Sequence, residues 1–180
     1  MMAQINIGAE QALATYPSAD PSFLGVYLAG IHDVPATVAA NNFMSLMNPT
    51  GSGKKIVVLG VTVADYSVST VTGSTSMEVW RVGASSGGTL TTAANVNRFV
   101  STFSNPVAEV RTGNPTVTLT GATALIGFPP TLGGGAQSPN SAATTPGASF
   151  ILSPGEGVVF VQNVGDVDER WNIQIIWAEK

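Results

Sequence analysis

The stretch Trp171-Asn172-Ile173-Gln174-Ile175-Ile176-Trp177 decides the fold class of this chain. Positions 171, 173, 175 and 177 are large and apolar, while positions 172 and 174 are polar amides. Successive side chains of a β-strand point to opposite faces, so this alternation indicates a strand with one face on a core. The sequence therefore predicts a strand over residues 171–177.

Further strand-like segments recur upstream, and three of them, residues 107–111, 116–120 and 124–128, are bounded by glycine, proline or asparagine. In the longest of all the upstream segments, positions 57, 59, 61 and 63 would share one face and positions 56, 58, 64 and 66 the other, with Gly60 allowing a bulge. Because both faces are apolar, we expect this strand to be central. The expected strands cover residues 42–47, 56–68, 77–82, 107–111, 116–120, 124–128, 149–152 and 157–162.

The connections between these segments are rich in turn-forming residues. Ser153-Pro154-Gly155-Glu156 has Pro before Gly and predicts a tight hairpin turn that pairs the two strands beside it. The stretches 69–75, 85–92 and 129–146, rich in Gly, Ser and Thr, predict loops. Many short strands without a convincing long helix favour an all-β fold, an antiparallel β-sandwich or jelly roll.

Residues 1–40 differ from residues 41–180, which we expect to form the β-sandwich domain. Their apolar residues follow neither the period of about 3.6 residues of a helix nor the period of about 2 of a strand for long. Pro17, Pro21 and Pro35 interrupt any helix. Two interpretations stay open. The segment either opens the same domain and covers an edge of its sheet, or it is an extended N-terminal arm that docks on a neighbouring subunit.

Composition limits the classes of function. The chain has 180 residues, enough for one self-sufficient domain, and no cysteine for a disulfide or thiolate site. Charged residues make up only 10%, well below the roughly 25% of typical soluble domains, so we expect an assembly partner. The net charge of −4 disfavours nucleic-acid binding. The start carries no secretory signal pattern, and no apolar run is long enough to span a membrane.

The segment Gly51-Ser52-Gly53-Lys54-Lys55 is similar to part of a phosphate-binding loop, but the match is incomplete. Such a loop needs a glycine at the position of Asn48, a hydroxyl after the Gly-Lys pair and a helix beyond it. Lys55 replaces the hydroxyl, and the following residues 56–59 predict a strand. We expect no nucleotide site here.

The remaining candidate groups predict no catalytic, cofactor or metal site. His32, the single histidine, has Asp33 beside it, but neighbours on an extended chain point apart, and no nucleophile motif accompanies them. Asp166, Asp168 and Glu169 could hold calcium, but they lack the glycine and distal glutamate of a calcium loop. A solvated turn in which Arg170 pairs locally is the favoured interpretation.

Aromatic and basic residues give no clear binding surface. Trp80, Trp171 and Trp177 alternate with core positions, so we expect them in the core rather than on a sugar-stacking surface. The sequence alone does not exclude a pair of glycosidase carboxylates, although no aromatic platform lies next to the acidic cluster. The arginines at positions 81, 98, 111 and 170 are scattered, so they form no basic patch for a nucleic acid.

Four segments carry a resemblance to small β-rich proteins encoded among the structural genes of tailed bacteriophages. They are spread over residues 41–180, and they are patterns of turn plus strand with no catalytic motif. The segments are Asn42-Phe43-Met44-Ser45-Leu46-Met47-Asn48-Pro49-Thr50-Gly51-Ser52-Gly53-Lys54, Ala108-Glu109-Val110-Arg111-Thr112-Gly113-Asn114-Pro115, Ser153-Pro154-Gly155-Glu156-Gly157-Val158-Val159 and Asp166-Val167-Asp168-Glu169-Arg170-Trp171-Asn172-Ile173.

The resemblance implies a structural virion protein made in the host cytoplasm, with a capsid decoration (cement) protein favoured. Such proteins are commonly homotrimers on the outer capsid surface, bound across capsomer boundaries, so the implied partners are the major capsid protein and copies of this chain. No cofactor, nucleic acid or membrane is implied. A neck, tail or fibre-attachment component, including a host-binding module, is the alternative, because fold alone does not fix the role.

Overall fold

The computed structural model describes residues 25–35, 41–65, 74–99, 103–132, 143–144, 150–163 and 170–180. Over these ranges the chain is nearly all β-strand, with a single 3-10 turn at Ala93–Asn95 and no α-helix. Every strand pairing is antiparallel. The predicted all-β, antiparallel class is therefore confirmed.

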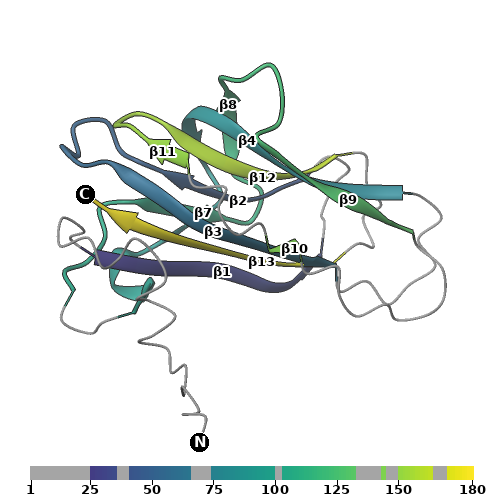
Figure 1. Cartoon of the computed structure of the whole chain (residues 1–180), viewed down its shortest axis with the longest axis horizontal. Helices are drawn as coiled ribbons and strands as arrows, with labels where there is room; N and C mark the ends of the chain where they lie inside the picture. Colours follow the sequence, from purple (N-terminus) through teal and green to yellow (C-terminus); the bar gives the residue numbers. More distant parts are fainter. Residues whose placement is uncertain are drawn as a thin grey trace, which may run out of the picture.

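One layer, sheet A, is built around the strand that the sequence marked most clearly. β13 (Arg170–Glu179) lies between β1 (Gly25–Pro35) and β3 (Ile56–Asp65), and these three strands run side by side in Figure 1. Shorter strands flank them among the described residues: β6 (Asn97–Arg98) pairs with β1, and β10 (Ala143–Thr144) and β11 (Phe150–Leu152) pair with β3.

The other layer, sheet B, has the strand order β5-β7-β2-β12-β4-β8 in the described chain, and β9 also pairs with β4 (Figure 1). The predicted strands are thus recovered with shifts of a few residues at their ends. The bounds are β2 (Asn42–Met47), β4 (Ser74–Ser86), β5 (Thr89–Thr91), β7 (Glu109–Thr112), β8 (Thr116–Leu119), β9 (Ile126–Leu132) and β12 (Gly157–Asn163).

The core lies between the two sheets and takes side chains from both. Trp171, Ile173, Ile175 and Trp177 of β13 are all buried, as the alternation in the sequence predicted. They pack in one cluster with side chains from sheet B, such as Phe160. The architecture is a β-sandwich, and a jelly-roll connectivity within it stays a prediction.

The faces that we predicted for β3 are wrong in its first half. Its pairing with β13 shifts register between Val58 and Gly60, so Leu59 is an extra residue in a β-bulge. Val58 and Val61 therefore both face the core, whereas Leu59 packs in a separate cluster with Val26 and Ala178. The bulge reverses the parity of the strand, which strict alternation cannot anticipate.

The hairpin that we predicted around residues 153–156 is also wrong, although the turn itself forms. Glu156 N–H donates to the Ser153 carbonyl at 2.9 Å, and Gly155 has a φ of +87°. The strands on either side nevertheless join different layers, because β11 pairs with β3 in sheet A and β12 pairs with β2 and β4 in sheet B. The turn crosses the sandwich.

Part of the segment that we separated as residues 1–40 belongs to the sandwich. Residues 25–35 form β1, which pairs with β13 from end to end and supplies the buried Tyr27 and Ala29. Residues 1–24 and 36–40 lie outside the described residues. An arm is thus a hypothesis for residues before Gly25 only.

Sheet B bends over its own outer face. β2 and β4 are separated by β12, yet Ser45 Oγ of β2 and Ser85 Oγ of β4 are only 2.8 Å apart. The far end of β4 therefore curls back over the sheet, and Figure 1 shows β8 standing above β4 and β12. The pairing of β4 with β8 shifts register between Val82 and Ala84, just before Ser85. The turns that follow β4 and β7 contain residues with φ between +58° and +70°, which glycine adopts most easily: Gly87, Gly88, Gly113 and Asn114.

Candidate functional site

The curled end of sheet B and β8 enclose a second apolar cluster, which we call the outer cluster. Met47, Val82 and Val159 are buried in it, although they point away from the main core. Trp80, Val117 and Val161 pack around these three and are only partly buried. The outer cluster thus joins β2, β4, β12 and β8 on the outside of the sandwich.

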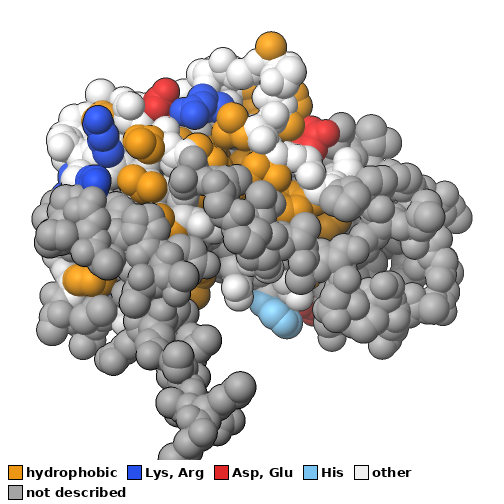
Figure 2. Space-filling view, in the orientation of Figure 1, with side chains coloured by type: hydrophobic (Ala, Val, Ile, Leu, Met, Phe, Trp, Pro, Cys, Tyr) orange, Lys and Arg blue, Asp and Glu red, His pale blue; other side chains and the backbone are white. Residues whose placement is uncertain are grey.

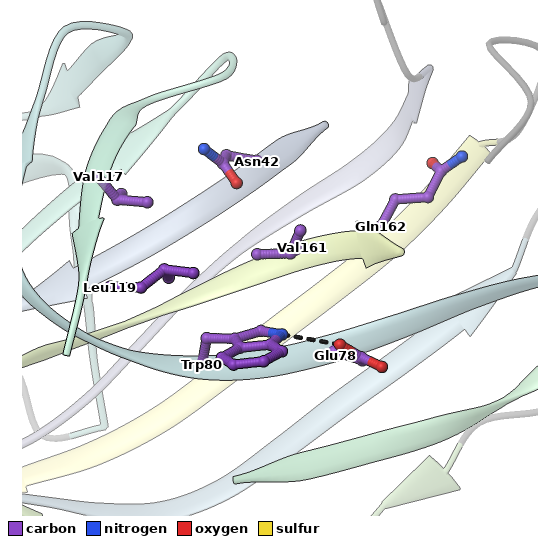
Figure 3. A pocket seen from close by; sticks show the side chains of 7 residues that line it. All are labelled: Asn42, Glu78, Trp80, Val117, Leu119, Val161 and Gln162. Carbon is purple, nitrogen blue, oxygen red and sulfur yellow. Dashed lines mark hydrogen bonds between the residues drawn. The ribbon is translucent and has the colours of Figure 1, made fainter. Parts of the chain in front are cut away.

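Beside the outer cluster lies an open hollow of about 320 Å³, which we call the outer groove. Its aliphatic lining comes from two sides, with Val117 and Leu119 on β8 and Val161 on β12, and these side chains gather around the hollow in Figure 3. Leu119 is 48% exposed. The lining is completed by Asn42, Glu78, Trp80 and Gln162.

Trp80 is the aromatic residue of the outer groove, and its ring is held in place. The indole Nε1 donates to Glu78 Oε2 at 2.7 Å, two positions earlier on the same face of β4 (Figure 3). Our prediction that all three tryptophans lie in the core holds for Trp171 and Trp177 and is wrong for Trp80. Because Met77 and Val79 face the core, the alternation along β4 already placed Trp80 on the other side.

Asn42 forms the polar end of the outer groove on β2. Its Nδ2 donates to the Pro115 carbonyl at 2.9 Å, and its backbone N–H donates to Asn114 Oδ1 at 3.1 Å. These bonds anchor the turn before β8 to the edge of the sheet. In Figure 3 the amide nitrogen of Asn42 points toward β8, which leaves the amide oxygen on the side of the groove.

A buried carboxylate, that of Glu179, is carried by the last residue of β13. Glu179 is 0% exposed, and its Oε1 accepts from the backbone N–H groups of Val107 and Ala108 at 2.8 and 3.0 Å. Its Oε2 accepts from Lys54 Nζ at 3.0 Å. The carboxylate thus accepts three donors from two separate loops, so its burial is offset by charge-assisted hydrogen bonds.

Tyr27 lies near this carboxylate and has a raised pKa. Burial is the main cause, because it disfavours the phenolate, and the negative charge of Glu179 adds to it. Tyr27 Oη donates to the Ser104 carbonyl at 2.9 Å, and its ring packs on Trp177 with centroids 5.7 Å apart. The neutral tyrosine thus serves as a core residue with a satisfied hydroxyl.

The segment resembling a phosphate-binding loop has a structural role. Lys54 pairs with Glu179, and the chain continues directly into β3 rather than a helix. Ser52 Oγ donates to Asn48 Oδ1 at 2.6 Å, and Asn48 Nδ2 donates to the carbonyls of Lys54 and Leu152. The buried Asn48 therefore closes this turn from within.

The other groups considered in the sequence are placed apart or engaged in local pairs. His32 is exposed, whereas Asp33 accepts from Arg170 Nη1 at 2.6 Å across β1 and β13. Arg170 thus pairs with a residue far along the chain, and the predicted local pairing in the turn before it involves residues outside the described ranges. Asp166, Asp168 and Glu169 lie outside the described residues. Among the described residues, no group of three or more His, Cys, Asp or Glu side chains is placed to hold a metal.

The scattered arginines stay apart in the fold, with each bound to its own neighbours. Arg81 approaches Glu156 at 3.4 Å, Arg98 donates to the Phe103 carbonyl, and Arg111 donates to the Gly87 carbonyl.

Within the ranges that the structure covers, no helix has the length and apolarity needed to cross a membrane. Comparison with protein families, with curated proteins and with solved structures gives no match to this chain.

Proposed function

We propose that this protein is a non-enzymatic structural component of a tailed-phage virion, a capsid decoration protein that binds across capsomer boundaries. The four segments that resemble phage structural proteins support it. Three of them fall on the described strands and turns β2 to β3, β7 to β8 and β11 to β12. In this proposal the protein acts through the contacts that its surface makes with other proteins of the virion.

The observation that carries the proposal is a low content of charged residues together with large apolar side chains that stay exposed on a sandwich with its own core. Only 10% of the residues are charged, and few charged side chains appear on the face shown in Figure 2. Such a surface is better suited to a partner than to water alone. Five large apolar side chains of the described residues are 40–51% exposed: Leu90, Phe99, Leu119, Leu125 and Ile151.

Many weak contacts repeated over a shell are enough for this role. Apolar burial contributes about 25 cal/mol per Å² before the costs of ordering. A modest interface therefore stabilises a capsid when many copies bind at once, because each bound copy resists the separation of the subunits beneath it. In this proposal the partners are the major capsid protein and further copies of this chain, with a trimer as the favoured oligomer.

Sedimentation of purified protein with capsids that lack it tests the proposal. We expect saturable binding to capsids with a copy number that matches the lattice, and a trimer in analytical ultracentrifugation of the free protein. Isolated tails of the same phage are the control. Binding to tails and not to capsids would favour the neck, tail or fibre alternative, and binding to neither would overturn a virion role.

A further inference from the structure

The outer groove offers chemistry of two kinds that the proposed decoration role does not use. At about 320 Å³ it lies at the lower end of the roughly 300–1,000 Å³ typical of small-molecule sites. One part of its wall is aliphatic, formed by Val117, Leu119 and Val161, and the other part carries a carboxylate and an amide. It is therefore shaped for a small ligand with an apolar side and a polar side.

The aromatic residue in this groove is fixed before any ligand arrives. The bond from Trp80 Nε1 to Glu78 Oε2 restrains the indole, so a ligand that packs on the ring has little side-chain entropy to overcome. Trp171 and Trp177 are 2% and 0% exposed, and in the described chain Trp80 is thus the tryptophan that a ligand can reach. A partly exposed, oriented indole is a stacking surface.

The polar groups of the groove are also held by the fold. Glu78 has two carboxylate oxygens, which act only as acceptors when ionised, and its Oε2 accepts from Trp80 Nε1. The amide of Asn42 is anchored through Nδ2 to the Pro115 carbonyl, which directs its oxygen toward the groove. Both groups are acceptors, and they suit a ligand that brings several hydroxyl donors.

We propose that the outer groove binds a saccharide residue. A pyranose presents C–H groups on one face and hydroxyl groups around its edge, which matches an indole and aliphatic wall beside a carboxylate and an amide oxygen. A purely apolar side chain of a partner protein fits less well, because it would strip water from Glu78 and Asn42 without replacing their hydrogen bonds. This binding activity goes beyond the decoration role and does not depend on it.

Saturation-transfer NMR on the full-length protein tests the proposal, with the methyl glycosides of glucose, galactose, mannose and N-acetylglucosamine as probes. We expect transfer to at least one of them, strongest at the C–H protons of one ring face. Trp80→Ala should weaken binding about tenfold, because it removes the stacking surface. Trp80→Phe keeps an aromatic face but loses the hydrogen bond to Glu78. Its affinity for the glycoside should therefore lie between that of the unmodified protein and that of Trp80→Ala.

Leu90→Ala on β5 is the matched control, since Leu90 is 45% exposed and does not line the outer groove. It should bind as the unmodified protein does, and circular dichroism should show that all variants keep the sheet signal. No transfer to any of the four glycosides would overturn the proposal. So would transfer that is unchanged in Trp80→Ala, or that is lost equally in Leu90→Ala.

Discussion

At the scale of single residues, Glu179 illustrates how a buried charge can hold distant parts of a β-sandwich together. Its two oxygens accept from Lys54 and from the backbone of residues 107 and 108, so one side chain ties the end of β13 to two loops. Sequence analysis did not predict this role. A glutamate beside the C-terminus of a segment has no local pattern that separates it from a solvated one.

Glu179→Ala should therefore lower the free energy of unfolding by about 3–5 kcal/mol, because it leaves Lys54 without its partner and two backbone donors without an acceptor. Urea denaturation, monitored by circular dichroism, measures this change in the free energy of unfolding. Glu109→Ala is the control, because Glu109 pairs with Arg111 at the surface and its loss should cost less than about 1 kcal/mol. Equal effects of the two substitutions would contradict the role of Glu179.

Tyr27 provides a prediction on pH. Its pKa is raised from 10.0 in the folded protein, so the unfolded chain loses this proton first as the pH rises. The contribution of Tyr27 to stability is complete below pH 10 and declines as the pH climbs toward the folded pKa. The unfolding free energy of Tyr27→Phe should consequently fall less steeply above pH 10, and parallel curves for the two proteins would contradict this.

The turn between β4 and β5 depends on glycine at a position where a side chain does not fit. Gly88 has a φ of +58°, and a Cβ there would collide with the Thr112 carbonyl oxygen. Gly88→Ala should cost about 1–3 kcal/mol in thermal or urea unfolding. Gly53→Ala is matched to it, since Gly53 has a φ of +68° with open space around it, and should cost less. A larger loss of stability in Gly53→Ala than in Gly88→Ala would mean that the turn at Gly88 can adjust to a side chain.

At the scale of elements, each strand that the sequence predicted is present, but β1, β5, β6 and β10 were missed and the partners of the strands were predicted poorly. The alternation in residues 171–177 placed β13 and its buried face correctly, because a half-buried strand shows its pattern locally. By contrast, the bulge at Leu59 and the crossing turn at Ser153 to Glu156 depend on which strand lies opposite. The outer groove was missed for the same reason, because β8 reaches Trp80 only after sheet B has curled.

Hydrogen exchange should separate the strands by their position in the sheets. β13 and β12 each pair along most of their length with strands on both sides, so we expect their amides to exchange slowest. β5 and β6 are short strands at the ends of their sheets and should exchange fastest. Exchange in β13 as fast as in β6 would contradict the strand order.

At the scale of the whole molecule, residues 25–35 belong to the sandwich, in line with the interpretation that the N-terminal segment opens the same domain. Deleting residues 1–40 removes β1, which supplies Tyr27 to the core and a neighbour to β13, so we expect the domain to unfold. Deleting residues 1–24 removes no described strand and should preserve the sheet signal in circular dichroism and a cooperative thermal transition. If both deletions leave the transition unchanged, β1 is not an integral strand.

The deletion of residues 1–24 also tests the arm hypothesis, because its product should fold. In the sedimentation experiment with capsids, we expect this variant to be retained less tightly than the full chain. Retention equal to that of the full chain would restrict the binding surface to the sandwich itself.

The central claim is that this chain acts through contacts of its surface on a viral shell. Electron microscopy of intact phage particles, with the chain labelled by a specific antibody, tests that claim most directly. The account predicts label at many regularly spaced positions over the outside of the capsid. Label confined to the tail or neck, or particles without label, would contradict it.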